Sequence, residues 1–501
     1  MQVQIDVANH LCQITPRLDP RVSFALDDLL SFGVPGSQFT QAYKSKGWDG
    51  KKRHYSVATQ RCPTGFLPEI VAKLTELGVA YTLRDLRTAP TLTNPVLPLR
   101  LPAWKHQLAI FETCAAQPRG LIQVATGGGK TAILAGVWGM LNVPGVVLTY
   151  RQELMFQLRD HISRYLGTKV GIFGAGQWEE GTLTVCMAQS LMKLAGSQYA
   201  RYLKEFEEED RNTDDLIIAK KMELHKALID TPEFVAIDEC HRAAAKGTYA
   251  IMQSLTKAYY RYGFSATAYG FRDDGLDHMI KAAIGPVIAK VTTSDLVDAG
   301  HLVPTDIVEI PYSHRGRKYT RDSYAKYCDT AIIENEDRNR LVVELAYGLF
   351  KKGKSVLVAV QRVDHGKLLA EYLGYLAGPH NVKFVYGNDE GAYRKEHLEA
   401  FAGKGLPILI STLVGEGVDW PHLNYCINCR GEESRIATIQ LLGRSMRAYS
   451  GKTRAMFFDI MDTSTTWLAK HAKTRASVYA GERCFTRHSV AAEHIKAFIG
   501  E

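Results

Sequence analysis

Short apolar runs alternate with helical stretches along most of the chain after residue 100. The runs are rich in β-branched and aromatic residues, which is typical of strands buried on both faces of a parallel sheet. They form two series, the first at 121–125, 145–150, 183–188, 234–238 and 261–267, and the second at 355–360, 382–387, 407–412, 425–429 and 455–460. Two such series predict two consecutive α/β domains that join around Val291–Pro304.

The two ends of the chain have other patterns. Residues 1–95 alternate at a shorter period and lead into a proline-rich link, which predicts a separate small α+β domain. Residues 466–501 have a helical and modestly basic pattern, and a charged segment at 202–230 predicts a solvated helical insertion. We therefore expect four segments, at 1–95, 96–303, 304–465 and 466–501.

Composition narrows the class of protein without naming a partner. Of the 501 residues, 46% are hydrophobic and 23% are charged, which is enough apolar material for several packed cores and excludes wholesale disorder. The formal net charge is +8, from 61 basic and 53 acidic residues. This charge permits an anionic partner and excludes a histone-like chain.

Neither a membrane span nor a disulfide framework is predicted. The uncharged stretch 132–150 is divided by the turn signal at 142–145 into a short helix and a short strand. The 9 cysteines are scattered, and Cys426 and Cys429 fall on opposite faces of one predicted strand, which disfavours a metal pair. The start of the chain lacks the pattern of a secretory leader. We expect an intracellular, cytoplasmic protein that acts as a monomer.

A glycine-rich loop follows the first apolar run and precedes an apolar helix. Small residues let backbone N–H groups surround phosphate oxygens, and the helix N-terminus adds the positive end of its dipole. We expect Lys130 to reach the β- and γ-phosphates of ATP and the Thr131 hydroxyl to bind Mg²⁺. The loop residues expected to surround the phosphates are Thr126, Gly127, Gly128 and Gly129.

Two acidic residues, Asp238 and Glu239, end the apolar run at 234–238. A carboxylate at the end of a buried strand can hold Mg²⁺ beside bound phosphates, and a second one can orient and deprotonate an attacking water. We assign Asp238 to the metal and Glu239 to the base. Alone, the pair is equally consistent with a solvated turn, but its position after a phosphate loop favours catalysis.

A short segment near the start of the chain, residues 40–55, interleaves basic and aromatic side chains. Basic groups contact phosphates and aromatic rings stack on unpaired bases, so the segment is a candidate nucleic-acid surface. A charged surface hairpin with a core tryptophan is the alternative. The candidate contacts are Lys44, Lys46, Trp48, Lys51, Lys52 and Arg53.

Further motifs stand in a fixed order around the loop. They are Gln107, the segment 150–154 (YRQEL), 238–241 (DECH), 265–267 (SAT), 411–419 (STLVGEGVD) and 440–447 (QLLGRSMR). In this order they resemble motifs Q, I, Ia, II, III, V and VI of the superfamily 2 helicases over residues 100–460. The resemblance implies two tandem RecA-like parallel-sheet domains and the use of ATP with Mg²⁺.

The resemblance also implies roles for individual residues. Gln107 would read adenine, and Gly417 and Asp419 would join the nucleotide site. Gln440 and Arg444 would sense the γ-phosphate, with Arg447 neutralising charge beside Arg444, and a spacing of three predicts that both arginines share one helix. The residues expected to couple hydrolysis to movement are His241, Ser265, Ala266 and Thr267. Those expected to touch the nucleic-acid backbone are Arg151, Gln152, Gln189, Ser190 and Thr412, although loop capping would also explain them.

A closer resemblance covers nearly the whole chain. Trp48-Asp49-Gly50, the segment 291–304 and the run 364–367 (DHGK) are similar to the phage UvsW helicases. This resemblance implies a DNA-binding N-terminal domain and remodelling of branched DNA in replication, recombination and repair. The implied reactions are Holliday-junction branch migration, fork regression and 3′→5′ unwinding. Two alternatives remain: a double-stranded DNA translocase of the restriction or repair type, and an ATP-gated nucleic-acid clamp with little turnover. Motifs that contact only the backbone leave RNA open as a partner.

Overall fold

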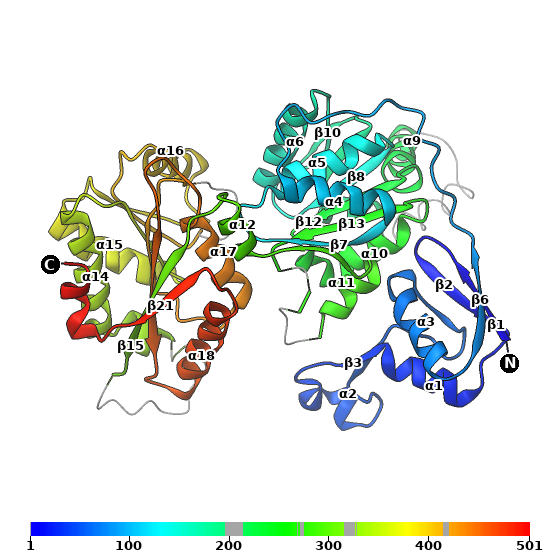
Figure 1. The fold of residues 1–501 in the computed structure, drawn as a ribbon, viewed down its shortest axis with the longest axis horizontal. Helices are drawn as coiled ribbons and strands as arrows, with labels where there is room; N and C mark the ends of the chain where they lie inside the picture. The colour runs from blue at the N-terminus through cyan, green and yellow to red at the C-terminus, as the bar shows by residue number, and fades with distance from the viewer. Residues whose placement is uncertain are drawn as a thin grey trace. The chain divides into compact units, whose positions relative to one another are not determined.

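The computed structural model describes the chain except residues 1, 196–213, 268, 271–274, 315–325, 327, 414–419 and 501. The chain divides into two compact units (Figure 1). The first comprises residues 1–124 and 129–290, and the second comprises residues 125–128 and 291–501. Each unit is built around its own sheet core.

The first unit contains an eight-stranded sheet in the order β10-β9-β11-β8-β12-β13-β7-β14. The pairings from β9 to β7 are parallel, and β10 is antiparallel to β9. The strands are β7 (Arg119–Val124), β8 (Gly145–Thr149), β9 (Gly171–Gly174), β10 (Gln177–Glu179), β11 (Leu183–Met187), β12 (Phe234–Asp238), β13 (Tyr260–Ser265) and β14 (Val287–Val291). All five apolar runs of the first predicted series are strands of this sheet.

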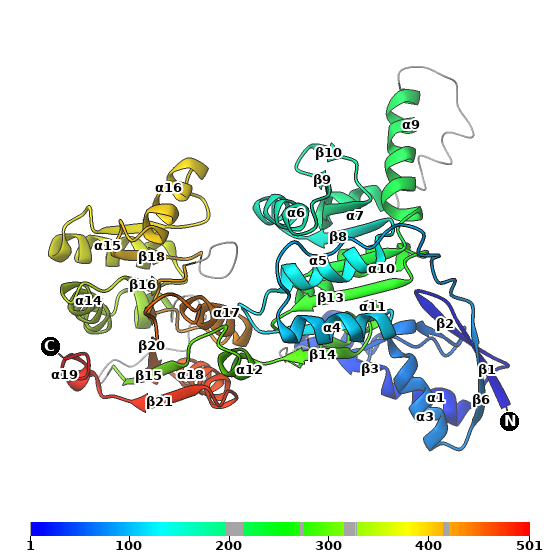
Figure 2. The same ribbon diagram turned by 45° about the horizontal axis from the view of Figure 1, so that its top comes forward.

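Helices of the first unit pack on the sheet in two groups. Contacts join α4 (Lys105–Ala116), α5 (Lys130–Leu141) and α6 (Gln152–Leu166) in one group. The other group joins α7 (Ala188–Ala195), α10 (Lys246–Ser254) and α11 (Asp277–Ala283). Within the predicted charged insertion, α9 (Asp214–His225) is helical and projects from the body of the unit (Figure 2); residues 202–213 lie outside the described residues.

The uncharged stretch 132–150 is divided between α5 and β8, as the turn signal predicted. Asn142 ends α5 in the left-handed conformation (φ 44°), and its N–H donates to the carbonyl of Trp138 (2.7 Å). Among the helices that the structure describes, none combines the length and the apolar character that a bilayer crossing requires.

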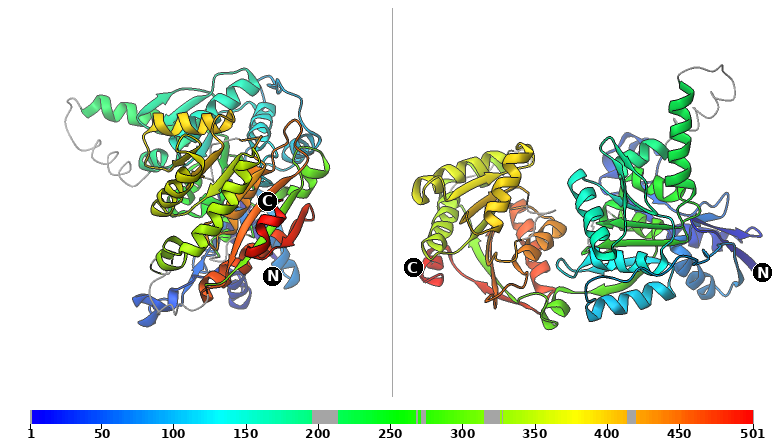
Figure 3. Two further views of the ribbon diagram at one scale, coloured as in Figure 1. Left: turned by 90° about the vertical axis from the view of Figure 1, so that its left-hand side faces the viewer. Right: turned by 90° about the horizontal axis from the view of Figure 1, so that it is seen from above.

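The first 85 residues form a small α+β domain inside the first unit. Its sheet has the order β5-β2-β1-β6, and a hairpin of β3 (Ser31–Gly33) and β4 (Lys51–Arg53) carries the short helix α2 (Gln41–Lys44). The remaining elements are β1 (Gln2–Val7), β2 (Leu11–Thr15), α1 (Pro20–Leu29), β5 (Arg61–Pro63), α3 (Leu67–Glu76) and β6 (Ala80–Asp85). Its core includes Ala282 of α11, so this domain packs on the first α/β domain (Figure 3).

The proline-rich link is an extended strap along the first α/β domain. The Leu97 N–H donates to the carbonyl of Gly139 (2.8 Å), and the Arg100 N–H donates to the carbonyl of Tyr165 (2.7 Å). A Cβ atom on Gly139 would lie 2.5 Å from the Leu97 carbonyl oxygen, so the strap requires glycine at this position of α5.

The second unit contains a seven-stranded parallel sheet in the order β17-β18-β16-β19-β20-β15-β21. Its strands are β15 (Thr305–Tyr312), β16 (Val356–Ala359), β17 (Val382–Val385), β18 (Ile408–Ser411), β19 (Tyr425–Asn428), β20 (Ala455–Asp462) and β21 (Phe485–Ser489). Its helices include α12 (Thr293–Asp298), α14 (Glu336–Lys351), α15 (Val363–Ala377), α16 (Gly391–Ala402), α17 (Arg435–Ser445), α18 (Thr466–Ala480) and α19 (Ile495–Phe498). Two tandem parallel-sheet domains preceded by a small α+β domain are the predicted fold class, which is confirmed.

Two details of the second unit bear on the sequence analysis. Cys426 and Cys429 lie in different hydrophobic clusters, as expected for residues that alternate faces of a strand. The purely helical character expected for 466–501 is wrong, because β21 pairs with β15 along the sheet edge. The Arg487 guanidinium pairs with Glu309 of β15 (2.8 Å), so this edge strand is held by cross-strand ion pairing that a helical pattern does not reveal.

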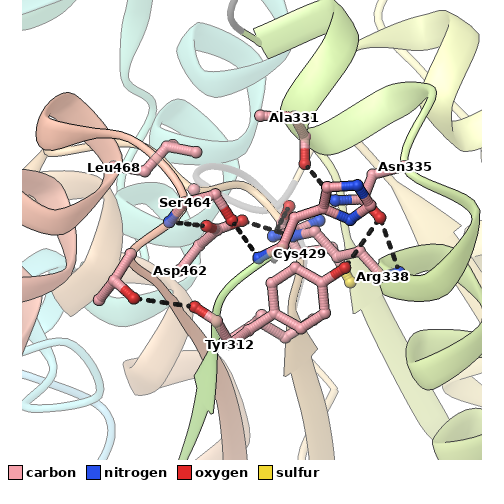
Figure 4. Close-up of polar contacts among 12 residues, drawn as sticks. Tyr312, Ala331, Asn335, Arg338, Cys429, Asp462, Ser464 and Leu468 are labelled. Atoms are coloured by element: carbon pink, nitrogen blue, oxygen red, sulfur yellow. Dashed lines mark hydrogen bonds and ion pairs between the residues drawn. The ribbon is translucent and has the colours of Figure 1, made fainter. Parts of the chain in front are cut away.

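A buried polar network ties the ends of three strands to α14 (Figure 4). Arg338 is fully buried; its Nε lies 3.3 Å from Asp462 Oδ2, and its Nη2 donates to the carbonyl of Cys429 (3.1 Å). The Asn335 side-chain oxygen accepts from Tyr312 Oη (2.8 Å) and from the Arg338 N–H (3.1 Å). The network therefore fixes the carboxyl ends of β15, β19 and β20.

Replacing Asp462 by asparagine should lower the free energy of unfolding by about 3–5 kcal/mol, because the buried guanidinium loses its counter-charge. Urea unfolding measures this loss. The matched control is Lys496→Ala, which removes an exposed pair with Glu344 (3.1 Å) and should cost less than about 1 kcal/mol. Equal losses for the two variants would contradict the interpretation.

Candidate nucleotide site

The glycine-rich loop joins β7 to α5 with a backbone that only glycine adopts easily. Gly127 and Gly129 have φ angles of 93° and 77°, in the left-handed region. Gly129 is the N-cap of α5 and supplies no side-chain hydrogen bond to the first turn. The helix amino end is therefore available to an anion, with Lys130 and Thr131 as its first two residues.

Gln107 lies against this loop. Its side chain is 4% exposed, and its Oε1 accepts a hydrogen bond from the Trp104 N–H (2.9 Å). A Cβ atom on Gly129 would lie 2.4 Å from Gln107 Nε2, so the amide packs directly on the loop backbone. The structure thus brings Gln107 to the loop, while its assignment to adenine stays a prediction.

Glu239 stands opposite the loop, one residue beyond the end of β12. Its Oε1 lies 3.6 Å from Lys130 Nζ, and its backbone is left-handed (φ 50°). A non-glycine residue in this region is uncommon and often marks a functional site. The turn directs the Glu239 carboxylate toward the lysine of the loop.

Two further side chains hold the same carboxylate. Ser265, the last residue of β13, donates from Oγ to Glu239 Oε2 (3.1 Å) and accepts from the Thr267 N–H (3.1 Å). His241 Nδ1 lies 3.3 Å from Glu239 Oε2 and 3.1 Å from Ser265 Oγ. The structure therefore brings together His241, Ser265 and Thr267, which sequence reasoning placed in one coupling group, and buried Ala266 lies between the last two.

Opposing effects act on the pKa of Glu239. Burial raises this pKa, but the nearby Lys130 ammonium and the hydrogen bonds from His241 and Ser265 together lower it by more. The net pKa lies below the usual range of a glutamate, so the carboxylate is ionised at neutral pH. An ionised carboxylate can accept a proton.

Asp238 and Thr131 are the predicted metal ligands. Asp238 ends β12 and Thr131 is the second residue of α5, and both are half-buried. One carboxylate and one hydroxyl suit Mg²⁺, which keeps several waters and completes its shell with substrate phosphates. Among the described residues, no group of three or more His, Cys, Asp or Glu side chains could hold a metal by itself.

The predicted backbone contacts of the first unit follow neighbouring strands. Arg151 and Gln152 follow β8, and Gln189 and Ser190 follow β11. Because β8 and β11 pair in parallel, these residues lie at the same sheet edge as the loop and Glu239. In the second unit, Thr412 follows β18, and its N–H donates to the carbonyl of Val385 (3.4 Å).

The second-unit arginines differ in placement. Gln440 and the mostly buried Arg444 lie on α17, but α17 ends at Ser445, so the expectation that Arg447 shares this helix is wrong. Arg447 instead forms a β-bridge with Leu302, and this pairing replaces further helical hydrogen bonds. Gly417 and Asp419 lie outside the described residues.

Part of the charge near the N-terminus is neutralised internally. Lys51 pairs with Asp28 (2.8 Å), and Arg53 pairs with Asp27 (3.0 Å) and Asp49 (2.5 Å). Trp48 donates from Nε1 to the carbonyl of its own hairpin at Lys51 (2.7 Å). Lys44 and Lys46 are exposed, and Lys52 is half-buried. The charged surface hairpin of the alternative interpretation thus describes Lys51 and Arg53, but the core position that it gave to Trp48 is wrong, because Trp48 is half-buried and lies outside the hydrophobic core of this domain.

The fold and this site define a protein with two parallel-sheet domains, in which a glycine-rich loop faces an ionised glutamate. Two family models match consecutive parts of the chain: "Type III restriction enzyme, res subunit" over residues 100–269 and "Helicase conserved C-terminal domain" over residues 337–449. With the ordered motifs, these matches support a superfamily 2 helicase that resembles the phage UvsW helicases.

Individual relatives are distant. The ATP-dependent DNA helicase uvsW of Enterobacteria phage T4 is 23% identical over 268 residues, which cover 49% of this chain and 52% of that protein. The DNA 3′-5′ translocase XPB2 of Sulfurisphaera tokodaii is 22% identical over 391 residues, which cover 71% of this chain and 81% of that protein. The match to uvsW thus spans about half of that relative's length.

One solved structure supports the fold, and a second is reported for comparison. A fragment of a putative HsdR subunit of a type I restriction enzyme from Vibrio vulnificus aligns over 92% of this chain and 83% of that chain, with a TM-score of 0.57 and 17% identity. The crystal structure of T4 UvsW aligns over 98% of this chain and 100% of that chain, with a TM-score of 0.45 and 16% identity.

Gly129→Ala should weaken ATP binding at least about tenfold, about 1.4 kcal/mol, because the new Cβ displaces Gln107 and strains the loop. A fluorescent ATP analogue measures the affinity. The control is Gly176→Ala, which has the same φ of 77° but no atom within 4 Å of the new Cβ. A control variant that binds ATP as weakly would show that backbone strain alone causes the loss.

Proposed function

We propose that this chain is an ATP-driven DNA helicase that remodels branched DNA by unwinding, Holliday-junction branch migration and fork regression. The observation that carries the proposal is the largely buried Glu239 carboxylate, which Lys130, His241 and Ser265 orient at the phosphate loop. A protein that only binds nucleotide has no need of an oriented base. This arrangement therefore favours a motor with turnover over an ATP-gated clamp.

In the proposed reaction, Lys130 and the loop backbone bind the β- and γ-phosphates of ATP. Water attacks the γ-phosphorus, the bond from that phosphorus to the β–γ bridging oxygen breaks, and ADP is released with phosphate. Glu239 accepts the proton that the water loses. When Lys130 turns to the phosphates, its attraction for Glu239 weakens, which raises the pKa of this base toward its ordinary value.

Other side chains support this step. His241 and Ser265 keep the Glu239 carboxylate in place by hydrogen bonds as Lys130 turns away. Thr131 and Asp238 would hold Mg²⁺, which supplies charge neutralisation on the phosphates. We assign to Gln440, Arg444 and Arg447 the sensing of the γ-phosphate and the neutralisation of its charge, and to Gly417 and Asp419 a supporting part in nucleotide binding.

We propose DNA as the substrate, in line with the names of the uvsW and XPB2 relatives. Branched DNA follows from the closer UvsW resemblance. In this proposal, residues 1–95 bind DNA, 96–303 and 304–465 are the two motor domains, and 466–501 extend the second. The protein acts inside the cell, as a monomer.

A double-stranded DNA translocase is the second candidate. The family model of residues 100–269 is that of a restriction-enzyme subunit, and the HsdR fragment has the same fold. Forked, four-way, triplex and RNA–DNA substrates in a strand-displacement assay separate the candidates. Displacement of a triplex strand without separation of any duplex would favour the translocase, and activity only on RNA–DNA duplexes would contradict a DNA substrate.

Glu239→Gln should reduce DNA-stimulated ATP hydrolysis by about 10²–10⁴-fold, because the amide cannot accept the proton, while ATP affinity changes little. Steady-state phosphate release with and without forked DNA measures the loss. The control is Glu112→Gln, which changes an exposed glutamate of α4 and should leave the rate as in the wild type. Undiminished turnover in Glu239→Gln would remove Glu239 as the base.

A further inference from the structure

A pocket of about 440 Å³ lies in the first unit where the N-terminal domain meets the first α/β domain. Strand β4 and the start of β5 form one side, and α10 and α11 form the other. The lining residues that matter here are Lys52, His54, Arg61, Lys246, Tyr249 and Met279. The nucleotide site does not account for this pocket, and of the candidate nucleic-acid residues in the segment 40–55, Lys52 and Arg53 line it.

The pocket collects positive charge that carboxylates neutralise only in part, because Arg53, which also lines it, pairs with Asp27 and Asp49. Lys52 Nζ lies 2.6 Å from the neutral sulfur of Met279, and Arg61 donates to the neutral amide of Gln13 (2.6 Å). Within the part of the chain that the structure describes, neither Lys52 nor Lys246 has a carboxylate within ion-pair distance. Burial and the neighbouring Lys246 lower the pKa of Lys52, so each ammonium raises the energy of the other. An anion between them would relieve this repulsion.

Neutral groups complete the pocket. His54 is 9% exposed, with its ring stacked near Phe32 (5.8 Å) and tilted against Tyr249 (6.2 Å). Its Nε2 is buried without a hydrogen-bond partner among the described atoms. Burial lowers the pKa of His54 to about 4, so the ring is neutral at physiological pH. It offers a hydrogen bond rather than a charge.

The amino end of α10 opens at the same place. Lys246 is the first residue of this nine-residue helix, and its N-cap, Ala245, supplies no side-chain hydrogen bond. The first backbone N–H groups and the positive end of the helix dipole therefore add to the lysine charges. The pocket combines cations, backbone donors and a buried imidazole, which together suit a phosphate oxygen.

We propose that this pocket binds a phosphodiester group of a DNA strand, with the sugar beside it filling the remaining volume. The volume exceeds that of a lone phosphate ion. Strand β4, which lines the pocket, is also the return strand of the hairpin that carries the exposed Lys44 and Lys46, so a strand backbone can continue along this hairpin. The inference rests on the proposed DNA motor and adds a specific backbone site to it.

The position of Lys246 connects the pocket to the nucleotide site. A short 3₁₀ helix, Cys240–Ala244, joins Glu239 to α10, and it contains His241. DNA bound at Lys246 therefore acts on this 3₁₀ segment, in which His241 orients the Glu239 carboxylate. Loss of this contact should reduce the stimulation of ATP hydrolysis by DNA.

The test compares Lys52→Gln, Lys246→Gln and the double variant with Lys52→Arg and Lys246→Arg, which keep the charge. Anisotropy of labelled forked DNA is measured between about 50 and about 200 mM salt. Each phosphate contact contributes about 0.7–0.9 to the slope of log K against log salt, so the double glutamine variant should lose about 1.5 from the slope. Its affinity at low salt should fall several-fold, and the arginine variants should keep both.

The control is Lys169→Gln, which removes an exposed lysine that does not line the pocket and should leave slope and affinity as in the wild type. A glutamine double variant with the wild-type slope would overturn the site. Inorganic phosphate is also compared with chloride at equal ionic strength. If phosphate releases more DNA than chloride does, the occupant of the pocket is a free anion, and the proposal of a DNA strand is wrong. Binding of RNA alone would overturn DNA as its occupant.

A separate measurement shows whether the proposed motor function fails. Wild-type ATP hydrolysis, measured with and without forked DNA, tests the motor and does not depend on the lysine variants. A wild-type protein that hydrolyses no ATP but shows the predicted slope difference would refute the motor and retain the phosphate site.

Discussion

A carboxylate that is largely removed from water is tolerated only where cations and hydrogen-bond donors surround it, and Glu239, whose side chain is 20% exposed, imposes this constraint on the first unit. Its partners come from three adjacent strands in the order β12-β13-β7. β12 leads into Glu239 itself, β13 ends in Ser265, and the loop after β7 supplies Lys130. Parallel pairing sets the three strand ends at one edge, so the sheet order itself assembles the site. A crossover that exchanged β13 with an outer strand would leave the carboxylate without Ser265.

The sequence predicts elements well where the signal is local. All ten apolar runs are strands, because a strand buried on both faces must be apolar along its length. In the two α/β domains, the apolar pattern does not predict β9, β10, β14, β15 and β21, which include short and edge strands with polar faces. The phosphate loop and the acidic pair are local too, since each motif is contiguous in sequence.

Features of the candidate sites that depend on contacts between distant residues could not be predicted from the sequence. The lysines of the N-terminal segment were judged by their local composition, but Lys51 and Arg53 are neutralised by Asp28 and Asp27, which lie outside that segment. Lys246 went unnoticed because nothing in its neighbourhood resembles a binding motif, and only the folded chain sets it beside Lys52. Arg447 has helical spacing from Arg444, yet its bridge to Leu302 ends the helix first.

Side-chain contacts with the first α/β domain hold the N-terminal domain in place, rather than the peptide strap at 86–103. Lys281 pairs with Glu69, His278 stacks on Phe32 (5.3 Å), and Arg119 donates to the carbonyl of Asn9 (3.1 Å). Those contacts persist whether or not the strap at 86–103 is continuous. A chain nicked within the strap should therefore behave as a two-fragment complex, in which the small fragment remains seated and completes the larger one. In evolutionary terms the domain is a fixed part of the first unit, and exchanging it for another would require the opposing surface to change as well.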